Sequence, residues 1–296
     1  MKKIILALSG FALLFTGCKE TDTPLDFNHT PSKDSIYLTT TIVPQTHNVL
    51  VEEFSGQSCP NCPAGHTDLE NLSANYPGRV NVIGYYASGN PQEVPPAGSI
   101  YDFENFTATQ IGTNIYGGIG FLPGAGIDRT VFSGNLYLGA SSWDGNITPL
   151  FTLTDSATLA VTSSYSTVDS VTTATITTTV TYLYPVTTSQ NLTIAIVEDS
   201  MVDKQENNAT ASGLDTFYLF TGVFRGMVTS GYSGDAILAD TTKATGMTER
   251  KIYTFILPAT TPAINPAHCR VIAFINGSTS PFGPIWQSEQ CKLSGL

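Results

Sequence analysis

Residues 49–63 read VLVEEFSGQSCPNCP and join an apolar run to two closely spaced cysteines. The run over residues 49–54 has the composition of a buried strand and ends at a Ser-Gly pair. Helical signals follow over residues 59–75 and stop at a Pro-Gly pair. A second β-prone run covers residues 80–86, at the distance that a βαβ crossover requires. This part of the chain therefore predicts a strand, a helix and a parallel strand.

The two cysteines lie three residues apart at the predicted start of that helix. Cys59 would face the unsatisfied N–H groups of the first turn, which stabilise a thiolate, the species that attacks disulfides. Cys62 would be the shielded thiol that resolves a mixed disulfide. Pro60 suits the first helical position, and Pro63 removes the N–H that would bond the Cys59 carbonyl. The motif predicts a dithiol for thiol–disulfide exchange, and a permanent structural disulfide is the alternative.

His66 follows Cys62 by four residues and Cys59 by seven, so a helix would place all three on one face. There it could lower the pKa of a thiol, or join an incomplete Cys2His metal site. A solvated helix histidine is the commoner alternative, and we predict neither a metal nor a cofactor. The acidic stretch 199–206 lacks the pattern of a calcium loop and is interpreted as a solvated loop. The remaining histidines have no sequence partners and are expected at the surface or in loops: His29, His47 and His268.

The strand, the CxxC at a helix start, the βαβ spacing and an isolated proline before a later strand resemble the thioredoxin superfamily. The resemblance implies that Pro123 is a cis-proline that faces the dithiol and grips substrate backbone. It also implies that Glu53, six residues before Cys59, is a buried carboxylate that relays the proton of the resolving thiol. Glu52 competes for that role. Ser58 stands where the superfamily often has a tryptophan, which affects substrate contacts more than redox competence.

The same stretch also resembles the signature of the outer membrane protein 28 family of lipoproteins, and looser similarity extends over residues 48–295. Some members of that family have been regarded as surface adhesins. The resemblance therefore implies either a redox protein of the envelope or a non-enzymatic adhesin or binding lipoprotein in which the CxxC is structural. The run Phe217 to Phe220 is a candidate contact surface for the second function, with a buried core strand as its alternative.

The N-terminus has the order of a secretory signal. A short basic start precedes an apolar run that is too short to span a membrane, so residues 1–17 are predicted to be a signal peptide. Residues 14–18 resemble a bacterial lipobox, which implies lipidation of Cys18. Residues 18–47 are then expected to form a lipidated tether and linker. These features predict a lipoprotein of the cell envelope at the outer membrane, with exposure at the cell surface as an option.

The second half of the chain has a different character. Residues 152–296 contain short β-prone runs without helical spacers, and residues 172–181 alternate threonine with aliphatic residues. This pattern favours an antiparallel, immunoglobulin-like sandwich, with a mucin-like stalk as the alternative for the threonine-rich part. The predicted fold class is thus an α/β thioredoxin-like domain over residues 48–151 followed by an all-β immunoglobulin-like sandwich.

The charge of the chain limits its partners. Its 296 residues carry 13 Lys and Arg against 24 Asp and Glu, a formal net charge of −11. Nucleic-acid binding needs clustered cations that are missing here. The predicted partners are disulfides or thiols of exported proteins, together with the membrane through the lipid anchor.

Cys269 and Cys291 complete the set of five cysteines and flank a plausible hairpin. Their near-symmetric placement would make them cross-strand neighbours, close enough for a structural disulfide. A bridge there would stabilise the fold by about 2–4 kcal/mol. Two free thiols are the alternative, which is less common outside the cytoplasm.

Overall fold

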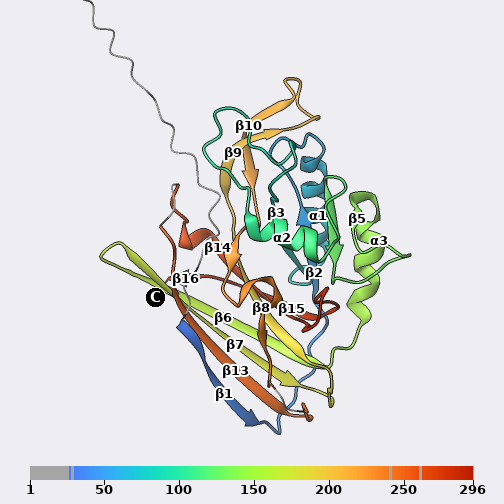
Figure 1. The fold of residues 1–296 in the computed structure, drawn as a ribbon, viewed down its shortest axis with the longest axis vertical. Helices are drawn as coiled ribbons and strands as arrows, with labels where there is room; N and C mark the ends of the chain where they lie inside the picture. The colour runs from blue at the N-terminus through green and yellow to red at the C-terminus, as the bar shows by residue number, and fades with distance from the viewer. Residues whose placement is uncertain (1–26, 28–29, 240–241, 260–261, 296) are drawn as a thin grey trace, which may run out of the picture.

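The computed structural model describes residues 27, 30–239, 242–259 and 262–295. This part of the chain folds into a large sheet with α-helices packed on it and a smaller sheet beside it (Figure 1). None of its helices is long and apolar enough to cross a membrane. The predicted signal peptide and the lipidation site Cys18 lie outside the described residues.

The large sheet contains strands from both halves of the chain. Its nine strands are β2 (Val49–Phe54), β3 (Val80–Tyr85), β4 (Gly124–Ile127), β5 (Leu138–Gly139), β8 (Gln190–Glu198), β11 (Val223–Met227), β12 (Asp235–Ala236), β14 (Cys269–Gly277) and β15 (Ile285–Lys292). Their order is β15-β14-β8-β11-β3-β2-β4-β5, with β12 paired to β8. Because β11 pairs with β3, the predicted boundary at residue 151 does not separate two sheets.

The first half follows the predicted strand–helix–strand order. β2 is buried along its whole length and pairs in parallel with β3. Between them lies α1 (Cys62–Asn75), which buries Leu69 and Leu72 and ends just before Pro77. β4 returns antiparallel beside β2, and β5 pairs with β4. These pairings confirm the two strands that the sequence predicted around the CxxC.

Two further helices complete this half. α2 (Phe106–Asn114) is preceded by the N-cap residue Asn105, whose side chain accepts two backbone N–H groups of the first turn. Such a cap satisfies donors that the helix itself leaves unpaired. α3 (Trp143–Ile147) is a short helix that continues into a 3-10 turn through Pro149. Trp143 is fully buried and fixes α3 against the β4 side of the sheet.

The smaller sheet comes from the second half of the chain and from its N-terminal part. Its five strands, in spatial order, are β1 (Thr30–Leu38), β13 (Met247–Ile256), β7 (Val171–Tyr182), β6 (Ala157–Val168) and β16 (Ser294–Gly295). In β7 buried residues alternate with more exposed threonines from Ala174 onward, as the sequence pattern predicted. The threonine-rich segment is therefore a half-buried strand, and the mucin-like stalk is excluded.

β1 corrects the prediction of a tether. Residues 30–38 pair antiparallel with β13, although they were expected to belong to a flexible linker. The side chains of residues 33–38 are largely exposed, so β1 is held mainly by its backbone hydrogen bonds to β13. For the same reason its sequence has little of the apolar periodicity that would have predicted a strand. Lys251 of β13 also pairs with Asp34 at 2.8 Å. Phe27, just before this segment, is buried against Phe255.

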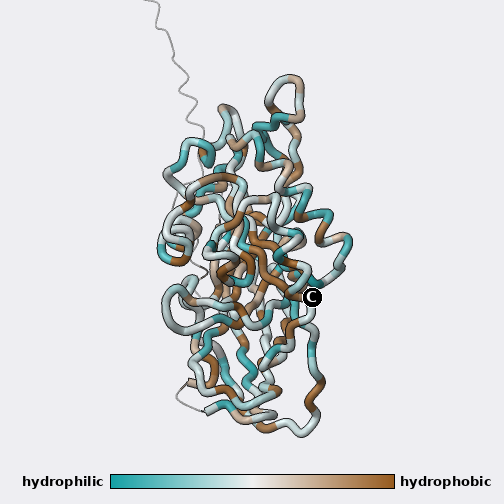
Figure 2. The backbone as a smooth tube through the Cα atoms, turned by 90° about the vertical axis from the view of Figure 1, so that its right-hand side faces the viewer, coloured by the Kyte–Doolittle hydropathy of each residue, from teal (hydrophilic) through white to brown (hydrophobic). Residues whose placement is uncertain are grey.

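Three apolar clusters hold the layers together. Alternate residues of β2 face opposite sides, so that Val49 and Val51 contact the cluster of α1 and α3, whereas Leu50 and Phe54 contact the cluster of α2. The third cluster fills the space between the smaller sheet and the strands β8 and β14. Figure 2 shows the most hydrophobic backbone gathered in the middle of the molecule. The second half therefore packs as two β-sheets face to face, in agreement with the coarse prediction of a sandwich.

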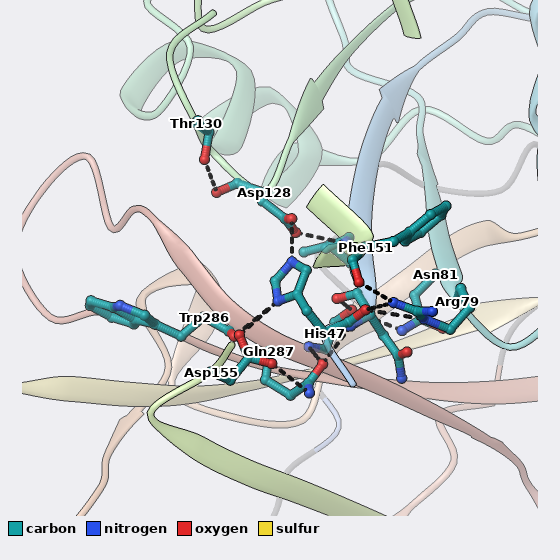
Figure 3. A network of polar contacts seen from close by, with 12 residues as sticks. His47, Arg79, Asn81, Asp128, Thr130, Phe151, Asp155, Trp286 and Gln287 are labelled. Carbon is teal, nitrogen blue, oxygen red and sulfur yellow. Dashed lines mark hydrogen bonds and ion pairs between the residues drawn. The ribbon is translucent and has the colours of Figure 1, made fainter. Parts of the chain in front are cut away.

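A buried histidine joins the two halves (Figure 3). His47 is 1% exposed, and its ring nitrogens lie 2.8 Å from Asp128 Oδ2 and 2.8 Å from Asp155 Oδ1. Burial acts to lower the pKa of His47, but the hydrogen bonds and charges of the two aspartates raise it to about 10. Gln287 of β15 donates to the other oxygen of Asp155. His47 lies in the loop before β2, as one of the two predicted options had it, but it is buried, and the side-chain partners that the sequence did not reveal come from distant parts of the chain.

One hairpin projects from the second half toward α1. β9 (Met201–Glu206) and β10 (Leu214–Phe220) form a separate two-stranded sheet, at the top of Figure 1. Phe220 is 1% exposed and packs beneath the hairpin, whereas Phe217 is 81% exposed. The run from Phe217 to Phe220 is therefore only partly a core strand. We call residues 201–220 the covering hairpin, because of its position over the CxxC described next.

Candidate functional site

Cys59 and Cys62 are joined in a disulfide, with their Cα atoms 5.4 Å apart. α1 begins at Cys62, so the prediction that Cys59 lies at the helix start is wrong. Pro63 has no N–H to continue the helical pattern, and the Cys59 carbonyl instead accepts the N–H of Cys62 at 3.2 Å in a tight turn. A Cys59 thiolate would therefore stand just outside the first helical turn.

The disulfide is completely covered. Both cysteines have an exposed fraction of 0%, although the sequence analysis expected a partner protein to reach Cys59. They belong to the apolar cluster that also contains residues of α2, β3 and β14. In the conformation of this structure no partner can touch the sulfur atoms, so that expectation is wrong for the resting protein.

The covering hairpin closes one side of the disulfide loop. The side-chain amide of Gln205 donates to the carbonyls of Gly56 and Cys59, at 3.1 and 3.0 Å. The N–H of Asn208, in the hairpin turn, donates to the Pro60 carbonyl at 3.0 Å. The Cys59 carbonyl, which the sequence predicted to be free, thus has two donors. The hairpin is held to the CxxC loop mainly by polar contacts, which a conformational change can exchange for water.

A second segment, around Gln92, also contacts the disulfide loop. Gln92 accepts the N–H of Ser58 at 2.9 Å, and its carbonyl approaches Gly56 so closely that a Cβ there would lie 2.2 Å away. Only glycine permits this contact between the two loops. The neighbouring Glu93 is buried, and burial raises its pKa to about 7. The disulfide loop is therefore in contact with both this segment and the covering hairpin.

Sequence reasoning missed the covering hairpin. The stretch 199–206 was interpreted as a solvated acidic loop, yet Asp203 is buried and accepts the backbone N–H groups of Ile100 and Tyr101. Asp199 is half-buried and is bound by Arg270 and by the N–H of Gly222. The alternation of buried and exposed positions along β9 was the available signal, but the charged residues obscured it.

Glu52 and Glu53 occupy opposite faces of β2 and have different partners. Arg129 binds Glu52 through two hydrogen bonds, at 2.7 and 2.9 Å. Burial alone would raise the pKa of Glu52, but the Arg129 charge and the hydrogen bonds of Arg129, Tyr116 and Tyr85 together lower it. Glu53 is 3% exposed with an Oε1 atom that has no hydrogen bond, and burial, with the charge of Glu70 adding to it, raises its pKa to about 8. Of the two, Glu53 is the carboxyl that can exchange a proton near neutral pH.

His66 is turned toward Glu53 and the covering hairpin. Its Nε2 lies 2.8 Å from Ser55 Oγ and 3.5 Å from Glu53 Oε1, and its Nδ1 lies 2.8 Å from the hydroxyl of Tyr218. Burial lowers the pKa of His66 to about 4, so the ring is neutral at physiological pH. The alternative of a solvated helix residue is therefore wrong. A neutral ring also cannot supply the positive charge that would lower the pKa of a thiol.

Pro123 lies directly before β4, and the peptide bond that joins it to Leu122 is cis. A Cβ added to Gly65 would lie 2.9 Å from the Pro123 ring, so this proline packs against the first turns of α1. The structure thus brings Pro123 beside the helix that begins at Cys62. Pro123 and Cys62 are both residues that the sequence analysis predicted to belong to the site.

The predicted bridge between Cys269 and Cys291 is not formed, and both are free thiols. The register of the hairpin explains the difference, because Cys291 lies opposite Val271, and the Cys269 carbonyl bonds to Leu293. The two cysteines are therefore diagonal neighbours in the apolar cluster between the sheets. Burial raises the pKa of Cys269 to about 12, which makes it an unreactive core thiol. Among the described residues, no group of three or more His, Cys, Asp or Glu could hold a metal ion.

Comparison with known proteins places the chain in a family. A family model described as outer membrane protein Omp28 matches residues 112–291. This range is more than half of the chain and begins after the CxxC. No curated protein sequence matches.

Three solved structures are similar to this chain. HBP35 of Porphyromonas gingivalis is 20% identical with a TM-score of 0.58, over 84% of this chain and 76% of that one. Protein AGR_C_4864 from Agrobacterium tumefaciens is 12% identical with a TM-score of 0.47, over 86% and 97%. A domain of the outer membrane lipoprotein Omp28 from Porphyromonas gingivalis is 12% identical with a TM-score of 0.31, over 48% and 91%. The first of these similarities supports the fold alone. The family model supports more: the chain belongs to the family of outer membrane protein Omp28, as the sequence resemblance predicted, and is assigned to the outer membrane of the cell envelope.

Proposed function

We propose that residues 48–151 form a thioredoxin-like unit whose Cys59–Cys62 pair exchanges electrons with disulfides or thiols of exported proteins. The order β2-α1-β3-α2-β4-β5-α3, with β3 parallel and β4 antiparallel to β2, supports this proposal. So do the disulfide before α1 and Pro123 before β4. Residues 152–296 then form an immunoglobulin-like sandwich that shares the large sheet.

The proposed reaction conserves atoms and electrons. The thiolate of reduced Cys59 attacks one sulfur of a partner disulfide, which forms a mixed disulfide and releases one partner thiolate. Cys62 then attacks the Cys59 sulfur, and the second partner thiolate leaves. Two electrons pass to the partner, whose two thiolates take up the two protons lost by the cysteines. Glu53 would carry the Cys62 proton, since its pKa lies near the working pH, and Pro123 would hold the partner's backbone.

This chemistry requires the covering hairpin to move. In the resting protein both cysteines are fully buried, and the hairpin binds the backbone of the CxxC loop through Gln205 and Asn208. The hairpin touches the CxxC loop through a small number of hydrogen bonds, whereas its base is packed in an apolar cluster in which Met201 and Phe220 contact Tyr86 and Phe103. Local opening of the part over the loop, with the base kept in place, is therefore the motion that the proposal requires. The proposal is therefore a gated dithiol, whose reactivity is set by the position of the hairpin.

A second function is favoured by one observation, the exposed fraction of 0% at both cysteines. In this alternative the protein is a non-enzymatic binding lipoprotein or adhesin, and the disulfide only fixes the loop before α1. The alternative predicts that Cys59→Ser leaves function intact, because no step depends on the sulfur.

The observation that carries the redox proposal is the Cys59–Cys62 disulfide at the entry to α1, with a protonatable Glu53 in the adjoining strand. It is tested by measuring how fast dithiothreitol reduces the disulfide, together with insulin reduction. Gln205→Ala removes the donor to the Cys59 carbonyl, so we expect reduction about tenfold faster, which corresponds to about 1.4 kcal/mol in the opening equilibrium.

The matched control is Val202→Ala, an exposed residue of the same strand that should leave the rate unchanged. Cys59→Ser should abolish insulin reduction in both backgrounds. If neither the wild type nor Gln205→Ala reduces insulin, the disulfide is structural and the second function stands.

A further inference from the structure

A cavity of about 570 Å³ lies between α1, β3, β14 and the turns at the base of the covering hairpin. The sheet leaves room for it because β11 pairs with β3 only at Val223 and Gly84. The first half of β3 therefore has no partner from β11, and Val80 and Val82 line the cavity there. The redox proposal uses one residue of its wall, Glu53, and no other part of this space.

Glu53 brings an unsatisfied acceptor to this cavity. It is 3% exposed, and its Oε1 atom has no hydrogen bond. His66 Nε2 lies 3.5 Å away, but that nitrogen is engaged with Ser55 Oγ at 2.8 Å. A buried acceptor without a donor is costly, so a ligand with N–H groups would repay that cost.

The charges around the cavity favour a cation. Arg270 on the opposite wall binds Asp199 through two hydrogen bonds, at 2.6 and 2.9 Å, so these two charges offset each other. Glu70 of α1 lines the cavity as an exposed carboxylate. Glu70 therefore supplies the excess negative charge of the wall at neutral pH, and Glu53, whose pKa burial raises to about 8, adds its own when a nearby cation favours the ionised form.

The remaining wall is apolar. Leu69 and Pro77 join Val80 and Val82 along it. A bare metal ion would need several oxygen or nitrogen ligands, and no suitable group of three exists among the described residues. An aliphatic chain, in contrast, would bury its carbon atoms against these side chains.

We propose that this cavity binds an aliphatic chain that ends in an ammonium or guanidinium group, with the cationic nitrogen donating to Glu53 and attracted by Glu70. Such a group supplies the missing donor and the opposite charge in one contact. The same chemistry is offered by a free alkylamine and by a lysine or arginine side chain of an exported protein.

The test is calorimetric titration of the full-length oxidised protein in detergent with n-pentylamine and n-pentylguanidine. 1-Pentanol, of the same length but neutral, is the ligand control. We expect the cations to bind at least about tenfold more tightly than the alcohol, because a charge-assisted contact is lost with the latter. A short acetylated peptide with one lysine distinguishes the two sources, since it binds only if a protein side chain can enter the cavity.

The protein variants make the assignment specific. Glu70→Gln at the cavity wall should weaken cation binding several-fold without affecting the fold, and Glu53→Gln should weaken it about tenfold. Asp68→Asn, an exposed residue of the same helix, should change nothing. Equal affinity for amine and alcohol, or binding that survives both glutamate substitutions, would overturn the proposal. Because the disulfide stays oxidised throughout, this result does not depend on whether the dithiol is a redox centre.

Discussion

Glu52 and Glu53 are adjacent in β2, yet they belong to two very different regions. On the α2 side, Glu52 accepts hydrogen bonds from Arg129, Tyr116 and Tyr85 and lies in a fully paired network. On the α1 side, Glu53 has a carboxyl oxygen without a hydrogen bond, and it lines a cavity. Both side chains are almost entirely buried.

The difference shows that burial alone does not decide what a carboxylate does. A buried carboxylate with a complete set of hydrogen-bond donors has a lowered pKa, stays ionised and has a structural role. A buried carboxyl without donors has its pKa raised, and such groups gather at functional sites. One strand thus supplies a structural ion pair on one face and a protonatable group on the other.

A substitution that breaks the ion pair of Glu52 with Arg129 should have the largest effect on stability. Arg129→Met leaves the Glu52 charge buried without its cation, so we expect the free energy of unfolding to fall by about 3–5 kcal/mol. Denaturant unfolding monitored by tryptophan fluorescence measures this loss.

The matched variant is the double substitution Glu52→Gln with Arg129→Met. It removes both charges and should recover a large part of the loss, because no unpaired charge remains. A single Arg129→Met variant that is as stable as the wild type would show that the ion pair does not hold this face together.

Glu53, on the other side of β2, should instead make the free energy of unfolding depend on pH. Glu53 has a pKa of about 8 in the folded protein against 4.5 in the unfolded chain, so the folded state holds an extra proton between these values. The free energy of unfolding should therefore fall as pH rises from about 5 to 8, by roughly 3 kcal/mol. Urea unfolding at a series of pH values gives the slope.

Glu53→Gln isolates this contribution. Gln cannot titrate, so the variant should lose the Glu53 part of the slope and become more stable than the wild type at pH 8. Parallel pH profiles for the two proteins would mean that Glu53 is already ionised at neutral pH, and the proton-carrying role would then be lost.

The contrast also explains what the sequence could predict. Local patterns predicted the strands around the CxxC and the alternation of β7, because those signals lie within one segment. The choice between Glu52 and Glu53 stayed open, since Arg129 lies 77 residues further along the chain. The same reason explains the missed partners of His47, which come from the end of β4 and the start of β6.

Three predictions about the cysteines were wrong, for different physical reasons. The start of α1 moved because a proline removed one hydrogen bond, and the free thiols follow from a register that places Val271 opposite Cys291. Cys59 is buried in an apolar cluster whose other members come from distant strands and from α2. The register and the burial are decided by tertiary contacts that composition and spacing do not encode, whereas the position of the helix start follows from a local signal, Pro63, that the sequence already contained.

The smallest expected effects concern two tyrosines whose hydroxyl groups form hydrogen bonds on opposite sides of β2. Tyr116 donates to the ionised Glu52 at 2.6 Å, whereas the Tyr218 hydroxyl lies 2.8 Å from the neutral ring of His66. Hydrogen bonds to charged groups are stronger, so Tyr116→Phe should cost about 1.5–3 kcal/mol and Tyr218→Phe about 1 kcal/mol. Tyr218→Phe should in addition loosen the covering hairpin and speed reduction of the disulfide, which Tyr116→Phe should not do. If both substitutions have the same cost and neither changes the reduction rate, the two sides of β2 are equivalent in energy and the hairpin is not held through His66.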